Sequence, residues 1–404
     1  MIRFLTAGES HGPALVVILE GIPAGLVLDF DAIHHELKRR QGGYGRGRRM
    51  AIESDKAEIL SGVRRGETIG GPIAMAIQNR DWTNWRHTMS READPPEDAG
   101  GAHRATVSRP RPGHADLAGI AKYDRGDIRD ILERASARET AARVAAGAVA
   151  RQLLAAAGIQ LTSHVFAVGS NRLPEDAVVT FEGAAALPHD APLRCVDQEL
   201  EARMIKEIDA AREAGDTCGG AFEVIATGLP PGLGSYIQWD RKLDGRLAQA
   251  LMSIPAIKAV GIGLGPDAAY RPGSRVHDEL VADASGTRAT GIGRPTNRAG
   301  GLEGGVTNGE DLRISAWMKP ISTLMKPLRS VDVTTMTPAA AAIERSDVCA
   351  VPAAAVVGEA MVALILADAL VEKFGGDSMS ELTRALSSAA EAVRARFSVG
   401  ARDA

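Results

Sequence analysis

A long apolar run near the C-terminus constrains the fold of this chain more than any other feature. From Pro352 to Phe374 the residues are apolar nearly all round a helix, and Gly375-Gly376 end the run. It approaches membrane-spanning length, but it carries Glu359 and Asp368, so a buried helix explains it better than a membrane span. We therefore expect this helix at the centre of the molecule, with the other elements packed around it.

The composition is that of an ordinary globular protein. Of its 404 residues, 45% are hydrophobic and 24% charged, and the net charge of −4 implies no general attraction to nucleic acid or membrane. Cys195, Cys218 and Cys349 are widely spaced, without a CxxC pair or a histidine at metal-ligand spacing, so we expect a reduced protein with no metal site. The N-terminus leaves no room for a signal peptide, and we expect a cytoplasmic protein.

Two segments half a chain apart resemble each other. Residues 12–26 and 219–233 both read as a strand followed by a Gly/Pro turn, and helices with acidic starts follow at 31–40 and 240–252. Chance similarity of common strand-turn composition is the alternative. The favoured interpretation is a duplicated unit, near 12–40 and 219–252, that gives two pseudo-equivalent halves.

The remaining pattern favours an α+β fold in one domain. Further strands are predicted at 72–78, 160–168 and 257–264, and further helices after the capping box Ser136–Glu139, over 197–214 and after Ser378. No GxGxxG follows a strand to open a helix, which disfavours a Rossmann fold. No low-complexity linker divides the chain, so we expect a single domain over 1–375 and a C-terminal helix with a polar tail over 376–404.

Three short segments place an acid–base side chain beside glycine, proline or arginine. They contain His11 (in 8–12), His114 (in 109–116) and Asp347 (in 345–349). A proton-transfer group beside fixed cations suits chemistry on a phosphorylated or carboxylated small molecule. If the segment around Asp347 is extended, Arg345 lies on the same face and favours its carboxylate form. Ordinary surface histidines are the alternative.

The basic loop from Lys38 to Arg49 holds six cations within twelve residues. It resembles an Arg/Gly segment that binds nucleic acid, but the rest of the chain is acidic and poor in aromatic residues. Guanidinium groups also bind carboxylates and phosphates in a bidentate manner, so we favour a small polyanion. The Ser136 helix start, the glycine-rich run 298–309 and Lys319–Thr323 are further candidate anion sites, and none fits an ATP-binding loop.

The motifs in these segments resemble those of the chorismate synthase family. Gly8-Glu9-Ser10-His11-Gly12, residues 134–140 and residues 345–349 are similar to its three signature segments. Residues 111–116, Gly304-Gly305 and 319–323 also match, in the family's order, and the resemblance extends from residue 1 to about 375. Ala135 stands where the family more usually has Ser, which removes one hydroxyl contact to a flavin.

The resemblance implies a lyase of the shikimate pathway. It would convert 5-enolpyruvylshikimate 3-phosphate to chorismate and phosphate by a 1,4-anti elimination that requires reduced FMN without net redox change. The family's fold is a β-α-β sandwich of antiparallel sheets with helices, assembled as a homotetramer. An FMN oxidoreductase that uses the same flavin site, and a nucleic-acid-binding protein, are the alternatives.

The resemblance also assigns roles to residues. His114 would serve the departing phosphate, His11 the reduced flavin, and Asp347 the C6 proton. The implied FMN contacts are Ala135, Ser136, Ala137, Pro255, Ala256, Gly304, Lys319, Pro320, Ile321, Ser322, Thr323 and Arg345. NADPH, as a possible reductant, would contact Arg40 and Arg46. The arginines available to the substrate's phosphate and carboxylates are Arg46, Arg48, Arg49, Arg111, Arg138 and Arg345.

Overall fold

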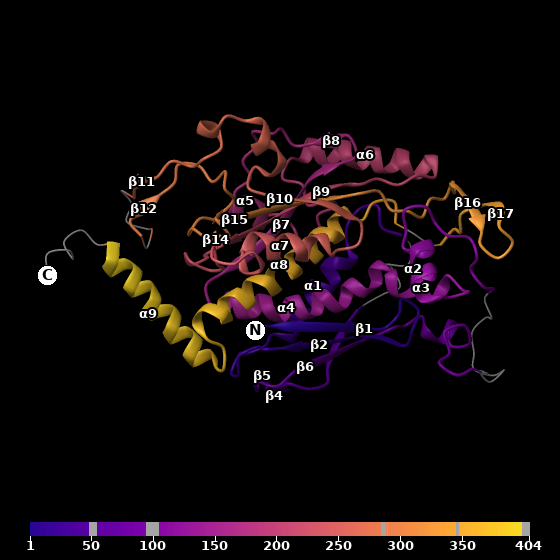
Figure 1. Cartoon of the computed structure of the whole chain (residues 1–404), viewed down its shortest axis with the longest axis horizontal. Helices are drawn as coiled ribbons and strands as arrows, with labels where there is room; N and C mark the ends of the chain where they lie inside the picture. The colour runs from indigo at the N-terminus through magenta and orange to yellow at the C-terminus, as the bar shows by residue number, and fades with distance from the viewer. Residues whose placement is uncertain (48–54, 94–104, 284–287, 289, 345–346, 398–404) are drawn as a thin grey trace.

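Two antiparallel sheets with helices between them form the body of the molecule (Figure 1). This computed structural model describes residues 1–47, 55–93, 105–283, 288, 290–344 and 347–397. The first sheet has the order β1 (Arg3–Ala7), β2 (Ala14–Glu20), β6 (Ile73–Gln78) and β3 (Ala57–Ile59). The second has the order β10 (Ile257–Ile262), β15 (Leu312–Met318), β9 (Gly220–Thr227), β7 (Gln160–Val168) and β8 (Asn171–Arg172).

The long apolar helix lies in the layer between the sheets. α8 (Val351–Phe374) packs against β7, β9 and α4 (Thr140–Ala156), and α4 in turn packs against β2 and β6. α1 (Phe30–Gln41) and α7 (Leu243–Met252) complete the layer. By length and composition α8 could cross a membrane, but 89% of its most apolar window is buried inside the protein. The prediction of a central helix is therefore confirmed.

The second sheet is covered on both faces. Its outer face is covered by α5 (Phe181–Ala185) and α6 (Gln198–Ala214), which explains why residues 221–226 of β9 are buried without alternation. Four two-stranded hairpins complete the described structure, and Figure 1 labels all of their strands except β13. They are β4 (Val63–Arg64) with β5 (Glu67–Thr68), β11 (Val281–Ala282) with β12 (Ile292–Gly293), β13 (Leu302–Glu303) with β14 (Val306–Thr307), and β16 (Arg329–Asp332) with β17 (Thr337–Ala340).

The two segments that resemble each other have the same local structure. β2 and β9 each end at a glycine with positive φ, Gly21 at 91° and Gly228 at 78°. A Cβ at either position would lie 2.2 Å from a backbone oxygen, so only glycine fits both turns. Each strand–turn unit is followed by a helix, α1 or α7.

One helix start differs from its prediction. Ser136 caps a short 3₁₀ turn, Ala137–Glu139, and α4 begins only at Thr140. The Ser136 hydroxyl accepts from the Arg138 amide at 3.3 Å, whereas the Glu139 carboxylate accepts from Thr6 at 2.6 Å instead of returning to Ser136. The prediction of a reciprocal capping box is therefore wrong, because the Glu139 carboxylate binds the hydroxyl of Thr6 from another part of the fold.

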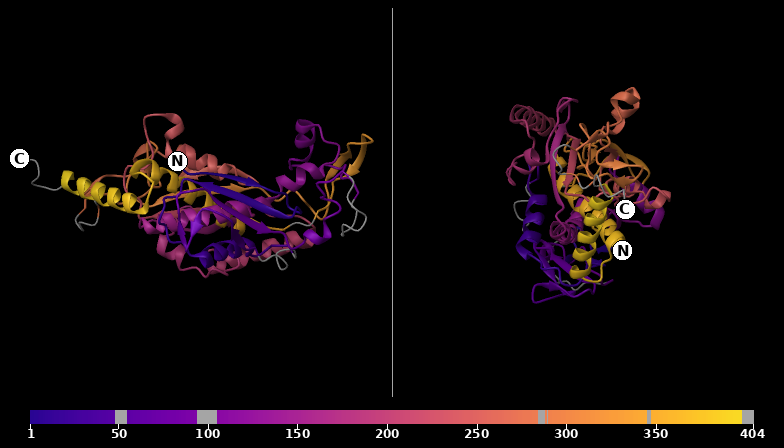
Figure 2. Two further views of the ribbon diagram at one scale, coloured as in Figure 1. Left: turned by 90° about the horizontal axis from the view of Figure 1, so that it is seen from below. Right: turned by 90° about the vertical axis from the view of Figure 1, so that its left-hand side faces the viewer.

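The C-terminal helix projects from the body. α9 (Met379–Phe397) extends away from the sheets, at the end opposite α2 (Asp116–Tyr123) and α3 (Arg129–Ala135), as Figures 1 and 2 show. Only Leu382 of this helix is buried. The polar tail beyond residue 397 lies outside the described residues.

Candidate active site

His114 is held by a buried carboxylate two residues farther along the chain. The imidazole Nδ1 lies 2.5 Å from Oδ1 of Asp116, the first residue of α2. Arg111 donates to the same carboxylate through Nε at 2.8 Å and Nη2 at 3.0 Å. Because the carboxylate can only accept, the Nδ1 that faces it carries a hydrogen. Nη2 of Arg111 also lies beside the ring, 3.0 Å from Nδ1 and 3.4 Å from Nε2.

The charge on Asp116 is stabilised although the side chain is fully buried. Burial by itself would raise the pKa of this carboxyl, but hydrogen bonds from His114 and Arg111 hold it well below the ordinary value. Asp116 is therefore ionised at any working pH and keeps the His114 ring in one orientation.

The segment Lys319–Thr323 lies against the same loop. Arg111 donates to the Thr323 hydroxyl at 3.0 Å, and Lys319 Nζ donates to the Gly113 carbonyl at 2.9 Å. A Cβ on Gly113 would lie 3.4 Å from Lys319 Nζ and 3.7 Å from Ser322 Cβ, so glycine permits this close approach. The structure therefore brings the predicted residues Arg111, His114 and Lys319–Thr323 together.

Lys319 lacks a carboxylate partner among the described residues, and burial and then nearby Lys258 lower its pKa. The backbone amide of Lys319 donates to the carbonyl of Ala256 at 2.9 Å. Ala256 has a φ of 68°, a left-handed conformation that an alanine rarely adopts. These features, an uncompensated cation and a strained backbone at residues predicted to contact FMN, are typical of an anion-binding site.

His11 is also held by a buried carboxylate. Its Nδ1 lies 2.9 Å from both oxygens of Glu133, on α3, and its backbone amide donates to Glu133 at 2.9 Å. The ring stacks on Trp85 with the centroids 3.7 Å apart. Burial would raise the pKa of Glu133, but the bonds from His11 and the charge of Arg129 lower it. His11 is thus a fixed, oriented imidazole.

Two of the predicted arginines support the backbone of the site. Arg138 forms an ion pair with Asp55, and Arg40 donates to the Ala137 carbonyl and the Thr140 hydroxyl, each at 2.9 Å. Both arginines are buried, 6% and 4% exposed. They fix the turn Ser136–Glu139, where Ala135, Ser136 and Ala137 are the predicted flavin contacts.

Asp347 forms an ion pair that the sequence did not indicate. Its carboxylate lies 2.8 Å from Nη1 of Arg46 and accepts from the Gly47 amide at 2.7 Å. Gly45 permits this, because a Cβ there would lie 2.9 Å from Cys349 Cβ. Three predicted residues lie outside the described part of the chain: Arg48, Arg49 and Arg345. The expected contact between Arg345 and Asp347 is therefore not described either.

Gly304 is the predicted contact that the chain does not bring to the others. It lies in the β13–β14 turn, across the body from α2 and α3 (Figure 1). Pro255 and Ala256, in contrast, precede β10 beside Lys319. The sequence missed the carboxylates Asp116 and Glu133 as site residues; the first could have been found from its spacing to His114, the second could not.

Three cations of the basic loop have partners or are buried in the part of the chain that the structure describes. Arg39 and Arg40 lie in the last turn of α1 and are buried, and Arg46 is paired with Asp347. Half of the six cations are therefore engaged inside the protein, which removes the main support for nucleic-acid binding. In the parts of the chain described here, no group of three or more metal-ligating side chains lies close enough together to hold a metal.

The chain is similar to chorismate synthases over its whole length. The family's sequence profile, described as chorismate synthase, matches residues 2–371. The chorismate synthase of Geobacter sulfurreducens is 57% identical over 398 residues, covering 98% of this chain and all of the relative. That of Salinispora tropica is 55% identical over 404 residues, with 98% and 100% coverage. A solved structure described as a crystal structure of chorismate synthase is 43% identical, with a TM-score of 0.76 and coverage of 97% and 98%.

Proposed function

We propose that the residues around His114, Lys319 and His11 form the catalytic site of this chain, which belongs to the chorismate synthase family and carries out that family's conversion of 5-enolpyruvylshikimate 3-phosphate to chorismate. The observation that carries the proposal is that two imidazoles, His114 and His11, are each oriented by a buried carboxylate, and that Lys319, which makes no ion pair among the described residues, lies against the His114 loop. A likeness of fold does not by itself locate the chemistry, and these contacts support its location around the two histidines.

We assign the departing phosphate to His114 and Lys319. As an imidazolium with both ring nitrogens protonated, His114 would donate its Nε2 proton to the leaving oxygen and become the neutral imidazole whose Nδ1–H stays bonded to Asp116, while the Lys319 ammonium balances the growing negative charge. Arg111 donates to Asp116 and Thr323, so we place it as a positioning residue rather than a substrate ligand.

We assign proton removal to Asp347. Arg46 and the Gly47 amide both contact its carboxylate, and these contacts fix the orientation of the oxygens that would take up the proton. The resemblance also gives Arg46 to substrate or NADPH, and its bond to Asp347 supports a place at the edge of the site. Arg40 and Arg138 are buried beneath the Ser136 turn, which supports a role in shaping the flavin site rather than contact with NADPH. Arg48, Arg49 and Arg345 stay predictions for substrate and flavin.

The residues fit reduced FMN. The Lys319 ammonium and the Ser322 side chain both lie beside Gly113, and neither has a carboxylate partner among the described residues. They would hold a phosphate or the polar edge of a flavin ring, with Ala256 and the Ser136 turn on its flanks. Reduced FMN, when bound, supplies electron density transiently without being consumed. Gly304 lies apart in one chain and is the least supported of the flavin contacts.

We further infer that the protein is a homotetramer in the cytoplasm. We also infer that each chain consists of two pseudo-equivalent halves. The matched glycines Gly21 and Gly228 support the equivalence. Leu5 on the edge strand β1 lies opposite Ile18, and they are 75% and 45% exposed. An apolar pair at an exposed sheet edge favours burial against another copy. Sedimentation velocity tests the assembly: a monomeric enzyme with full activity would contradict it.

The experiment that tests the function is an anaerobic assay of phosphate release from 5-enolpyruvylshikimate 3-phosphate. We expect release with dithionite-reduced FMN, none with oxidised FMN, and no stoichiometric consumption of reductant. Consumption of one reductant per turnover would favour the oxidoreductase alternative. Full turnover without any flavin would contradict the assigned cofactor.

A further inference from the structure

A second basic pocket lies away from the candidate active site. It has a volume of about 200 Å³ and lies between α1, the end of α4, the start of β7 and α5. Arg151 and Ala155 line it near the C-terminal end of α4, whose N-terminal end carries the candidate site. At a rise of 1.5 Å per residue, the two sites are separated by about 20 Å along this helix.

Two of its three arginines are neutralised by carboxylates. Arg39 Nη2 lies 2.7 Å from Glu359 Oε1, and Arg39 Nη1 lies 2.7 Å from Glu36. Arg151 also pairs with Glu359, and its Nη1 lies 3.7 Å from Glu36. These four side chains balance one another, so they leave no net charge for a ligand.

Arg194 is the cation left over. It is 5% exposed and lines the pocket. Its guanidinium donates to two backbone carbonyls, those of Ser163 at 3.1 Å and Pro188 at 3.3 Å, and its Nε has no partner. Within the described residues no carboxylate lies within ion-pair distance of it. Burial lowers the pKa of Arg194, and the charges of Glu359 and Glu36, which act on it from beyond ion-pair distance, do not offset this. A buried cation without a direct ion pair is costly, so this position favours a bound anion.

The electrostatics of a rim residue agree with this. The pKa of His189, at the exposed rim, is lowered by burial and then by the positive charges of His35, Arg39 and Arg194. The protonated form of His189 is therefore disfavoured at the mouth of the pocket, which agrees with a surplus of positive charge there.

The remaining lining selects among anions. Phe181, which is 9% exposed, supplies apolar surface beside Arg194, and the nearly inaccessible Ile159 and Leu161 complete the apolar lining. Orthophosphate would leave this apolar surface unused, whereas a carboxylate on a compact apolar body would bury it. The volume is smaller than the roughly 300–1,000 Å³ of drug-sized sites, so the ligand is small.

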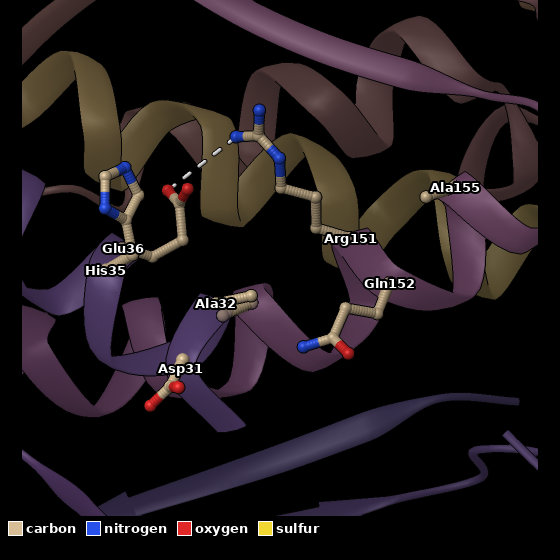
Figure 3. A pocket seen from close by; sticks show the side chains of 8 residues that line it. Asp31, Ala32, His35, Glu36, Arg151, Gln152 and Ala155 are labelled. Carbon is tan, nitrogen blue, oxygen red and sulfur yellow. Dashed lines mark ion pairs between the residues drawn. The ribbon is translucent and has the colours of Figure 1, made fainter. Parts of the chain in front are cut away.

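The neighbouring hollow does not share these properties. It has a volume of about 500 Å³, and Figure 3 shows Glu36 and Arg151 facing each other across it, with Asp31 and Gln152 nearby. Its charges are of both signs and include two acids, so it offers no preference for an anion. The two hollows share Arg151 and Ala155, and only the one with Arg194 has a surplus of positive charge.

We propose that the Arg194 pocket binds a small carboxylic acid, with the carboxylate on Arg194 and a compact apolar ring against Phe181, Ile159 and Leu161. This site is separate from the catalytic site, and its occupant needs neither phosphate nor flavin.

Calorimetric titration of the full chain with benzoate tests the proposal. Benzamide, which has the same shape without the charge, and inorganic phosphate are the comparison ligands. Ala185→Glu places a negative charge at the exposed rim, and Ala185→Gln is the neutral control of the same size. Arg194→Gln removes the anchor itself.

We expect benzoate to bind and benzamide and phosphate to bind at least ~10-fold more weakly, since a charge-assisted hydrogen bond is worth about 1.5–3 kcal/mol. Ala185→Glu and Arg194→Gln should weaken benzoate by at least ~10-fold, and Ala185→Gln by less than ~3-fold, with turnover unchanged in both Ala185 variants. Equal benzoate affinity in Ala185→Glu and Ala185→Gln would overturn the site, even if Arg194→Gln does not fold. Phosphate binding as tightly as benzoate would overturn the ligand class.

Discussion

The molecule contains the same three chemical groups in two different settings. In the candidate site, Arg111 and His114 both bind the Asp116 carboxylate. In the second sheet, His164 Nε2 lies 2.9 Å from Glu223, and Arg313 donates to the same carboxylate at 2.6 and 3.0 Å. In both, burial opposes the charge of the carboxylate and its two partners lower its pKa.

What differs is the surroundings. The His114 side chain is 19% exposed and lies on a glycine-bounded loop beside Lys319, whereas His164 is 2% exposed within a strand. His164 contacts the ring of Phe166, and Nη1 of Arg313 donates to the backbone carbonyl of Val179. The comparison of the two clusters indicates that an imidazole, a carboxylate and a guanidinium stabilise a sheet when they are enclosed. The same three groups can act as a binding or catalytic site only where a ligand can reach them.

The largest expected difference is in turnover. His114→Ala should lower kcat by ~10²–10⁴, the usual contribution of a positioned general acid, with FMN and substrate binding little changed. His164→Gln, the matched control, should leave kcat within ~3-fold because it touches no substrate, and should lower only the melting temperature. Steady-state phosphate release and thermal unfolding of both variants check this. Comparable losses of kcat in the two would break the comparison.

Removing the carboxylate that orients His114 should also lower kcat, but by less than removing His114 itself. Asp116→Asn keeps the shape of the side chain but no longer fixes Nδ1–H of His114, so we expect kcat to fall by ~10–100-fold, within the range seen when a histidine loses its orienting carboxylate. The Michaelis constant should move little. An Asp116→Asn enzyme with normal kcat would show that His114 needs no orientation.

Lys319 should affect affinity more than rate. Lys319→Gln removes a charge-assisted contact worth about 1.5–3 kcal/mol, so the dissociation constant for FMN or for the phosphorylated substrate should rise by ~10–100-fold. Exposed Lys326→Gln, seven residues on and in the same loop region, is the control. Fluorescence titration with FMN measures the affinity for the flavin, and a separate titration with the phosphorylated substrate measures the affinity for substrate. Unchanged affinity of Lys319→Gln for both ligands would show that Lys319 is not part of the site.

The enclosed cluster of His164, Glu223 and Arg313 should make the free energy of unfolding depend on pH in the acid range. The pKa of Glu223 is lowered in the folded state, so its contribution is present above the unfolded value near ~4.3 and is lost as pH falls through the folded value. Glu223→Gln should cost about 3–5 kcal/mol at pH ~7, and the gap to wild type should narrow below pH ~4. Urea unfolding at both pH values measures it. A gap that does not change with pH would mean that the charge of Glu223 is not what stabilises the sheet.

The sequence predicted the periodic elements well and the tertiary pairings poorly. The central helix at 351–374, the strand Gln160–Val168 and the helix ending at Ala214 follow from composition and caps within the segment itself. The short helices α2 and α3 lack such signals, since neither has a side-chain cap, and they were missed.

The site shows the same division. His11 and His114 could be named from their motifs, but Glu133 lies 122 residues from His11 in the chain, and only the fold joins them. Arg138 was expected to bind substrate, whereas a distant acid, Asp55, binds it in the structure. A carboxylate partner across the fold decides whether an arginine is available, and a single sequence does not reveal such partners.

The account is tested most directly by mapping which histidines a substrate shields. Diethyl pyrocarbonate acylates accessible neutral imidazoles, and mass spectrometry locates the modified residues with and without 5-enolpyruvylshikimate 3-phosphate and FMN. We predict that His114 is modified in the free enzyme and protected by the ligands, while His164 is unmodified in both. Modification of His114 that proceeds equally fast with the ligands bound, or reaction of His164 at the same rate as His114, would contradict the account.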